Sequence, residues 1–141
     1  MLSTSVTPRF GDIDGLRHIN NTKLPEWFEL ARMPLYRIFH PDLNFDGWGL
    51  IMARIAVDFT AQMTFDKDVE IRTWVSRIGR SSFTVTQEAW QDGVVGARGE
   101  AVVVHYDFAN RKSLPIPDRQ REELSLHLNE EETGEGDTSE G

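Results

Sequence analysis

Apolar residues recur at intervals of four, three, four and four positions between residues 24 and 39. The residues on this stripe are Leu24, Phe28, Ala31, Leu35 and Phe39. Because such spacing gathers side chains on one face of a helix, it predicts a helix that begins near Thr22. Pro25 suits the first turn of that helix, where a missing N–H costs no intrahelical bond. Pro34 removes a bond further along, so we expect the helix to kink or break near Met33 and restart.

In the second half of the chain the apolar positions recur every second residue, which is typical of strands. The alternating positions hold Val69, Ile71, Thr73 and Val75, and then Phe83, Val85, Gln87 and Ala89, all apolar except Thr73 and Gln87. The expected strands lie at about 4–11, 50–61, 68–78, 82–91 and 95–107. Turn residues in IGRSS and QDGVVG separate successive strands, which predicts an antiparallel meander. With one long helix before the meander, this order predicts an α+β fold in which an antiparallel sheet of about five strands wraps around the helix.

The formal net charge of −8 comes mainly from the C-terminus. Residues 129–141 hold six of the 23 acidic residues and no basic residue, which leaves 17 acidic and 15 basic residues, or −2, in residues 1–128. This acidic end lacks apolar residues, so we expect it to be disordered, either as a solubilising terminus or as a docking tail for a basic partner. The sequence therefore predicts one domain at 1–120, a C-terminal extension at 121–128 and an acidic tail at 129–141.

Composition excludes several classes of function. The chain has no cysteine and therefore no disulfide, thiolate metal ligand or cysteine nucleophile. Its four histidines show no metal-ligand spacing, so no metal site is expected. The sequence has neither a basic stripe for nucleic acid nor a run of about 18 apolar residues for a membrane span, so neither partner is expected. The N-terminus lacks a basic and then apolar leader pattern, and a cytoplasmic location is the simplest interpretation.

The segment RFGDIDGLRHINN, residues 9–21, places two aspartates, a histidine and two asparagines between a predicted strand and the predicted helix. This segment and the WFELAR that follows it resemble the opening of the hot-dog acyl-CoA thioesterases of the 4-hydroxybenzoyl-CoA thioesterase type. The likeness continues through VDFTAQMTFDKDVEIRTWVSRIGRSSFTVTQEAW and covers about residues 8–117. The resemblance implies the hot-dog fold and an acyl-CoA thioesterase that releases a free acid and coenzyme A without a metal or redox cofactor.

The resemblance also assigns the catalytic residues. It gives the catalytic carboxylate to Asp14 and not to Asp12, acting as a nucleophile through a mixed anhydride or as a general base. The backbone N–H of Asn21, at the helix start, is the implied donor that polarises the thioester carbonyl. His18 joins this catalytic group, where it binds water, holds the loop or modulates the pKa of the carboxylate. An aspartate at a strand end also commonly forms an Asx turn or caps the next element, so a structural role for Asp14 stays open.

Predicted substrate-binding residues lie in two segments. In the first, Asn20 ties the loop to the helix start, while Arg17 and Leu24 stand where the family often has glycine and tyrosine. If that glycine has a positive φ, Arg17 either adopts it at a cost or the loop differs. Leu24 gives a more aliphatic pocket wall, and the side chain of Arg17 suits a phosphate. The second segment is the turn SRIGRSS, whose side chains for phosphates and pantetheine amides are Arg77, Arg80, Ser81 and Ser82. A solvated hairpin turn explains this second set equally well.

The resemblance further implies a homodimer whose sheets join edge to edge, with active sites at the interface, and often a tetramer of such dimers. A small sheet around one helix leaves edge strands that need cover, which favours the same assembly. A different function stays open: a non-catalytic acyl-thioester-binding or assembly module with the hot-dog fold. A hot-dog dehydratase or hydratase fits less well, because those enzymes rely on a differently placed histidine with an acidic partner.

Overall fold

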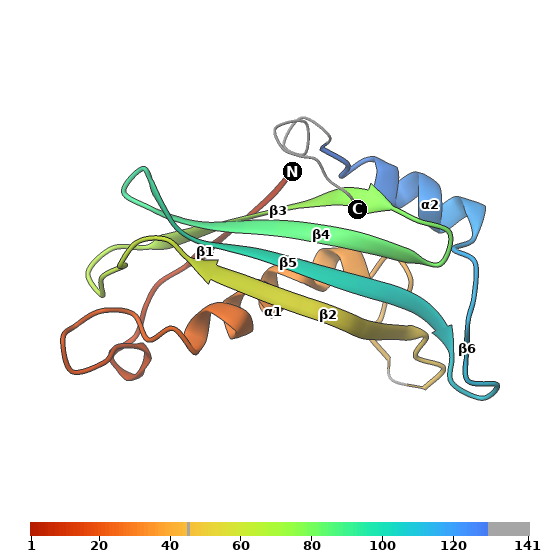
Figure 1. Ribbon diagram of the computed structural model, residues 1–141, viewed down its shortest axis with the longest axis horizontal. Coiled ribbons are helices and arrows are strands. Elements are labelled where there is room, and N and C mark those ends of the chain that lie inside the picture. Colours follow the sequence, from red (N-terminus) through yellow and green to blue (C-terminus); the bar gives the residue numbers. More distant parts are fainter. Residues whose placement is uncertain (45, 130–141) are drawn as a thin grey trace.

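The computed structural model describes residues 1–44 and 46–129. Its elements are β1 (Leu2–Val6), the 3₁₀ turn η1 (Phe10–Asp12), α1 (Lys23–Tyr36), β2 (Leu50–Phe59), β3 (Val69–Ile78), β4 (Ser82–Gln91), β5 (Val94–Asp107), β6 (Lys112–Ser113) and α2 (Asp118–Ser125). Within the described residues, six strands form one antiparallel sheet in the order β1-β3-β4-β5-β2, with β6 paired to β5. Helix α1 lies across one face of the sheet and α2 lies beside β3 (Figure 1).

The predicted α+β fold, an antiparallel sheet around one long helix, is confirmed. The four strands expected after residue 50 agree with β2 to β5 within two residues at each end. The prediction of a first strand at 4–11 is wrong beyond Val6, because the chain turns at η1, where the Asp12 N–H donates to the Arg9 carbonyl at 2.8 Å. Neither β6 nor α2 was predicted.

The predicted break of the long helix at Pro34 is also wrong. Helix α1 continues to Tyr36, and the Arg37 N–H donates to the Met33 carbonyl at 3.0 Å. Pro34 and Leu30 both lie on the exposed side of the helix. On that side water can bond the Leu30 carbonyl that Pro34 leaves without a donor, so the helix tolerates the missing hydrogen bond.

The hydrophobic core consists of two clusters along α1. The first surrounds the N-terminal half of the helix and contains Ile19, Leu24, Trp27, Phe28, Ala31, Met63, Val69, Ile71, Ala89 and Ala97. The second surrounds its C-terminal half and contains Leu35, Tyr36, Ile38, Leu50, Val75, Phe83, Val85, Val103, Ile116 and Leu124. Between them lies a buried polar layer of Arg32 from α1, Thr73 from β3 and Gln87 from β4.

The C-terminal part of the described chain packs against the rest of the domain. Helix α2 spans the boundary that the sequence suggests at residue 120, and Leu124 is fully buried. The N–H of Asn129, the first residue of the predicted acidic tail, donates to the Val75 carbonyl at 2.9 Å. Residues 130–141 lie outside the described residues. None of the described helices is both long enough and apolar enough to cross a membrane.

Helix α1 approaches the sheet most closely where β5 has glycine. A Cβ atom on Gly99 would lie 2.7 Å from Cε2 of the Phe28 ring, well inside van der Waals contact. Phe28 is almost completely buried, at 1% exposure, so its ring has little room to move away. Gly99 therefore sets the distance between α1 and β5.

We predict that Gly99→Ala lowers the free energy of unfolding by about 1–3 kcal/mol, because the added methyl overpacks the contact with Phe28. Urea denaturation of the purified variant measures this change. Gly11→Ala is the matched control, since a Cβ on Gly11 meets nothing within 4 Å. An equal effect of both substitutions would contradict the packing explanation.

Candidate active site

The segment between η1 and α1 forms a small hairpin. Ile13 and Ile19 pair as an antiparallel bridge, and the Asp14 N–H donates to the His18 carbonyl at 2.9 Å. A tight turn closes the hairpin, with the Arg17 N–H donating to the Asp14 carbonyl at 3.1 Å. Arg17 adopts a left-handed φ of +67° at this turn. A position where the family often has glycine therefore does require a positive φ, and arginine occupies it.

Asp14 projects its carboxylate into the same hairpin. Its Oδ1 accepts the backbone N–H of Leu16 at 2.9 Å and that of His18 at 3.1 Å, which is the geometry of an Asx turn. These bonds, with the Leu16 N–H contributing most, hold the pKa of the exposed Asp14 carboxyl below its usual value. Asp14 is therefore ionised at neutral pH. Within the described part of the chain, no group bonds its second oxygen, Oδ2.

Asp12 occupies a different environment from Asp14. It is 3% exposed, its Oδ2 accepts the Arg9 N–H at 2.8 Å, and its Oδ1 lies 3.7 Å from Nζ of Lys23. These contacts join the turn before the hairpin to the first residue of α1. Asp12 therefore has a structural role at the start of α1.

The start of helix α1 carries both asparagines of the motif. The Asn20 side-chain oxygen accepts the N–H and the hydroxyl of Thr22, each at 2.9 Å, so Asn20 ties the hairpin to the helix as expected. The next residue, Asn21, is exposed, and none of the described residues accepts its backbone N–H. A free N–H beside the positive end of a helix is suited to stabilise a developing oxyanion.

A cavity of about 330 Å³ opens beside Asn21. It lies between the start of α1, the end of β2 with the loop after it, and β5. Its lining residues are Ile19, Asn21, Leu24, Phe59, Thr60, Ala61, Gln62, Met63 and Gly96. Leu24 forms part of the cavity wall. Asp14 does not line the cavity, but it lies on the same hairpin as the lining residue Ile19.

Glycine makes room for one side of this cavity. A Cβ on Gly96 would lie only 2.5 Å from Cγ of Met63, so the methionine rests directly on the β5 backbone. Met63 is 5% exposed and contacts the first core cluster. Its carbonyl accepts the Ile19 N–H at 2.8 Å, which joins the cavity wall to the Asp14 hairpin.

The second predicted binding segment lies at the other end of the sheet. The turn holding Arg77, Arg80, Ser81 and Ser82 joins β3 to β4, next to α2 (Figure 1). Carbonyls of this turn accept hydrogen bonds from Arg121 and from the Ile116 N–H. The ten residues of β4 run from this turn to the end of the sheet where the Asp14 hairpin lies. At 3.3 Å per residue they span about 30 Å. One chain therefore does not bring Arg77, Arg80, Ser81 and Ser82 together with Asp14 and Asn21.

The sequence interpretation missed Gln91, which fixes the loop between β2 and β3 against the Asp14 hairpin. Gln91 is buried, and its amide bonds the backbone of Thr64. The sequence does contain a signal for Gln91. This polar residue has the same two-residue spacing as Val85 and Ala89, which lie on the apolar face of β4. The same signal, a polar residue on the apolar face of α1, marks Arg32.

Among the described residues, no group of three or more His, Asp or Glu side chains is arranged to hold a metal ion.

Comparisons with known proteins agree with this geometry. The family model described as the thioesterase-like superfamily matches residues 8–124. A predicted thioesterase from Bacillus stearothermophilus is 41% identical, with 90% of this chain and 96% of that chain covered and a TM-score of 0.86. A thioesterase from Thermus thermophilus, solved in complex with coenzyme A and Zn, is 27% identical over 88% of this chain and 91% of that chain, with a TM-score of 0.77. A comparison with curated proteins gives no match.

The left-handed turn allows a direct test of the hairpin geometry. We predict that Arg17→Gly unfolds with a free energy about 1–2 kcal/mol higher than Arg17→Val, because a β-branched residue adopts a positive φ at considerable cost. Both variants remove the same exposed charge, so the difference between them reports the backbone alone. Chemical denaturation of the pair measures it. Equal stabilities would show that the turn does not have this conformation.

Proposed function

Because the chain belongs to the thioesterase-like superfamily and has its hot-dog fold, we propose that it hydrolyses an acyl-CoA thioester to a free acid and coenzyme A. Thioester hydrolysis is the activity that the family and the similar structures support. The observation that carries the proposal is a free Asn21 N–H that lines an open cavity, with an ionised Asp14 on the hairpin that leads into the same helix start. Each group supplies one requirement of acyl transfer.

The reaction needs a group that brings oxygen to the carbonyl carbon and a donor for the oxyanion. The free Oδ2 of Asp14 either takes a proton from the attacking water or attacks the carbon itself to form a mixed anhydride that water then cleaves. In both routes the C–S bond breaks and coenzyme A leaves as the thiolate, which takes up a proton. The Asn21 N–H stabilises the negative oxygen, and Leu24 contributes an aliphatic wall for the acyl group.

Assembly into a dimer is part of the proposal. Strand β2 is ten residues long and lies at an edge of the sheet. Its exposed large apolar side chains are Ile51, Met52, Ile55 and Phe59. A long apolar edge of this kind is a template for pairing with another strand. A second copy of the chain, joined through its own β2, covers this edge and extends the sheet.

Such a dimer also explains the separated binding segments. When two β2 strands pair antiparallel, the Leu50 end of one strand lies beside the Phe59 end of the other. The Arg80 turn of one subunit then lies at the same end of the joined sheet as the Asp14 hairpin of the other. Arginines and serines in that turn are suited to the phosphates and amides of coenzyme A, the molecule present in the Thermus thermophilus complex.

We predict that Asp14→Asn lowers kcat for acyl-CoA hydrolysis by roughly 100-fold or more, because the amide has neither the charge nor the basicity of the carboxylate. The amide oxygen still accepts the Leu16 and His18 N–H groups, so the hairpin keeps its shape. Thiol release from short, medium, long and aromatic acyl-CoAs measures the effect and identifies the acyl class.

Asp12→Asn is the matched control for this test. It removes the charge near Lys23 but retains an acceptor for the Arg9 N–H, so we expect lower stability and little change in kcat. Equal turnover by the wild type and the Asp14 variant would contradict the catalytic role of Asp14. No turnover by either protein on any substrate would favour a binding or assembly module instead.

We predict that Ile55→Lys produces a monomer that has lost most of its turnover, because a charge on the β2 edge opposes strand pairing. Ile55 is 47% exposed, so the substitution leaves the core of the single subunit intact. Native mass spectrometry and the thiol-release assay measure the two effects. Val94→Lys places the same charge on a 55% exposed apolar residue at the start of β5 and serves as the control. A fully active monomer would contradict the role of the edge.

A further inference from the structure

Gln91 uses its whole side-chain amide to hold one loop. It is the last residue of β4 and is 8% exposed. Its Oε1 accepts the Thr64 N–H at 2.7 Å, and its Nε2 donates to the carbonyls of Thr64 at 2.7 Å and Lys67 at 3.0 Å. The amide bonds both the N–H and the C=O of Thr64, as the backbone of a neighbouring strand would do in a sheet. The loop between β2 and β3 thus gains a backbone partner although it contains no regular element at Thr64.

A tight turn between β4 and β5 fixes the backbone that carries Gln91. Gln91 pairs with Val94 across a two-residue turn in which Asp92 and Gly93 have φ values of +55° and +79°. These are the values of the tight turn that fits the twist of an antiparallel hairpin. The side chain of Gln91 therefore projects from a fixed point of the sheet.

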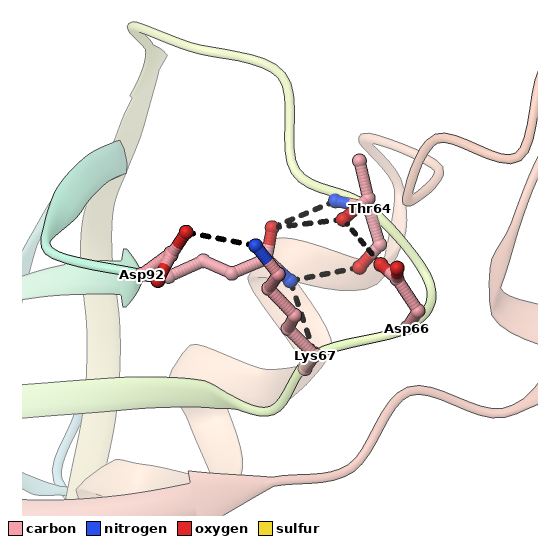
Figure 2. A network of polar contacts seen from close by, with 5 residues as sticks. Thr64, Asp66, Lys67 and Asp92 are labelled. Carbon is pink, nitrogen blue, oxygen red and sulfur yellow. Dashed lines mark hydrogen bonds and ion pairs between the residues drawn. The ribbon is translucent and has the colours of Figure 1, made fainter.

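The charged groups around Gln91 are exposed at the surface. Nζ of Lys67 lies 2.7 Å from Oδ2 of Asp92, and the Thr64 hydroxyl donates to Oδ1 of Asp66 at 2.8 Å; Figure 2 shows both contacts. The Lys67 and Asp92 side chains are 50% and 72% exposed, and exposed ion pairs contribute little to stability. The buried amide of Gln91, and not this ion pair, therefore holds the part of the loop from Thr64 to Lys67.

The loop in turn holds the Asp14 hairpin. Thr64 pairs with His18 as an antiparallel bridge, and the neighbouring Met63 carbonyl accepts the Ile19 N–H at 2.8 Å. His18 bonds Asp14 twice, through its carbonyl to the Asp14 N–H and through its N–H to Oδ1. Contacts therefore run without interruption from Gln91 to Thr64, from Thr64 to His18, and from His18 to the carboxylate.

We propose that Gln91 is a positioning residue that fixes the Asp14 carboxylate relative to the Asn21 N–H. This inference rests on the proposed hydrolysis. Asp14 itself is exposed and lies on a hairpin that the 63–64 backbone bonds on one side and that Asn20 ties to α1 on the other. The distance between a catalytic carboxylate and its substrate depends on such support, and a displacement of about 1 Å can cost 100-fold in rate. Gln91 supplies the support from outside the cavity lining and without touching the substrate.

The test replaces Gln91 by methionine, which has similar volume and no hydrogen-bonding amide. We expect Gln91→Met to lower kcat by about 10- to 100-fold while KM changes less than about threefold, because the reacting group moves and the binding surfaces stay. We also expect faster amide hydrogen exchange at His18 and Ile19, with no change at Val85 in the centre of β4.

Lys67→Met is the matched control, because it breaks the exposed ion pair with Asp92 and leaves the Gln91 amide in place. Its kcat and its exchange at Ile19 should equal those of the wild type. An unchanged kcat in Gln91→Met, or a lowered kcat without faster exchange at His18 and Ile19, would overturn the positioning role while wild-type hydrolysis still supports the proposed function. A wild type that hydrolyses no acyl-CoA would overturn the proposed function itself, and with it any positioning role in hydrolysis.

Discussion

Among the described residues, one positively charged side chain, Arg32, lies buried between helix α1 and the sheet. Arg32 is 3% exposed, its Nε donates to the Tyr36 hydroxyl at 2.9 Å, and its Nη1 donates to Oε1 of Gln87 at 3.1 Å. Gln87 continues the layer by donating to the Phe28 carbonyl at 2.8 Å and to the Thr73 hydroxyl at 3.1 Å. Buried polar groups of this kind are costly unless every partner is in place. Sliding α1 along the sheet would break several of these bonds at once, so the layer fixes the register of the helix.

The register of α1 decides where its first turn lies, and the site is built outward from that point. Glycines on β5 let Phe28 and Met63 rest on the strand backbone, so the helix start lies close to the sheet with a cavity beside it. Asn20 then joins the helix to the Asp14 hairpin, and Gln91 holds the other side of that hairpin through the loop after β2. Two buried amides on β4, Gln87 and Gln91, thus support the two groups of the proposed chemistry, Asn21 and Asp14.

Local patterns predicted most of the fold, while features set by distant contacts were missed. The strand patterns predicted β2 to β5 within two residues at each end. The glycine of the family replaced by Arg17 left two alternatives open, and the positive φ is the one that the structure has. The predicted helix break failed because exposure, which the local pattern does not encode, decides what Pro34 costs. Gln91 was missed for a similar reason, since its partners lie 24 and 27 residues away along the chain. Predicting it requires knowing which loop returns to the end of β4.

The distance between the two predicted binding segments carries the strongest argument about assembly. The sequence motif groups Asp14, Asn21 and the Arg80 turn into one site, whereas the single chain holds them at opposite ends of a ten-residue strand. A ligand the size of coenzyme A touches both sets only if another copy of the chain supplies the second. The strand positioned to recruit that copy is β2, which is exposed, long and apolar at the edge nearest the cavity residue Phe59. In the proposed dimer, edge pairing and completion of the site are therefore two consequences of the same geometry: the sheet ends on β2, and the cavity opens where β2 ends.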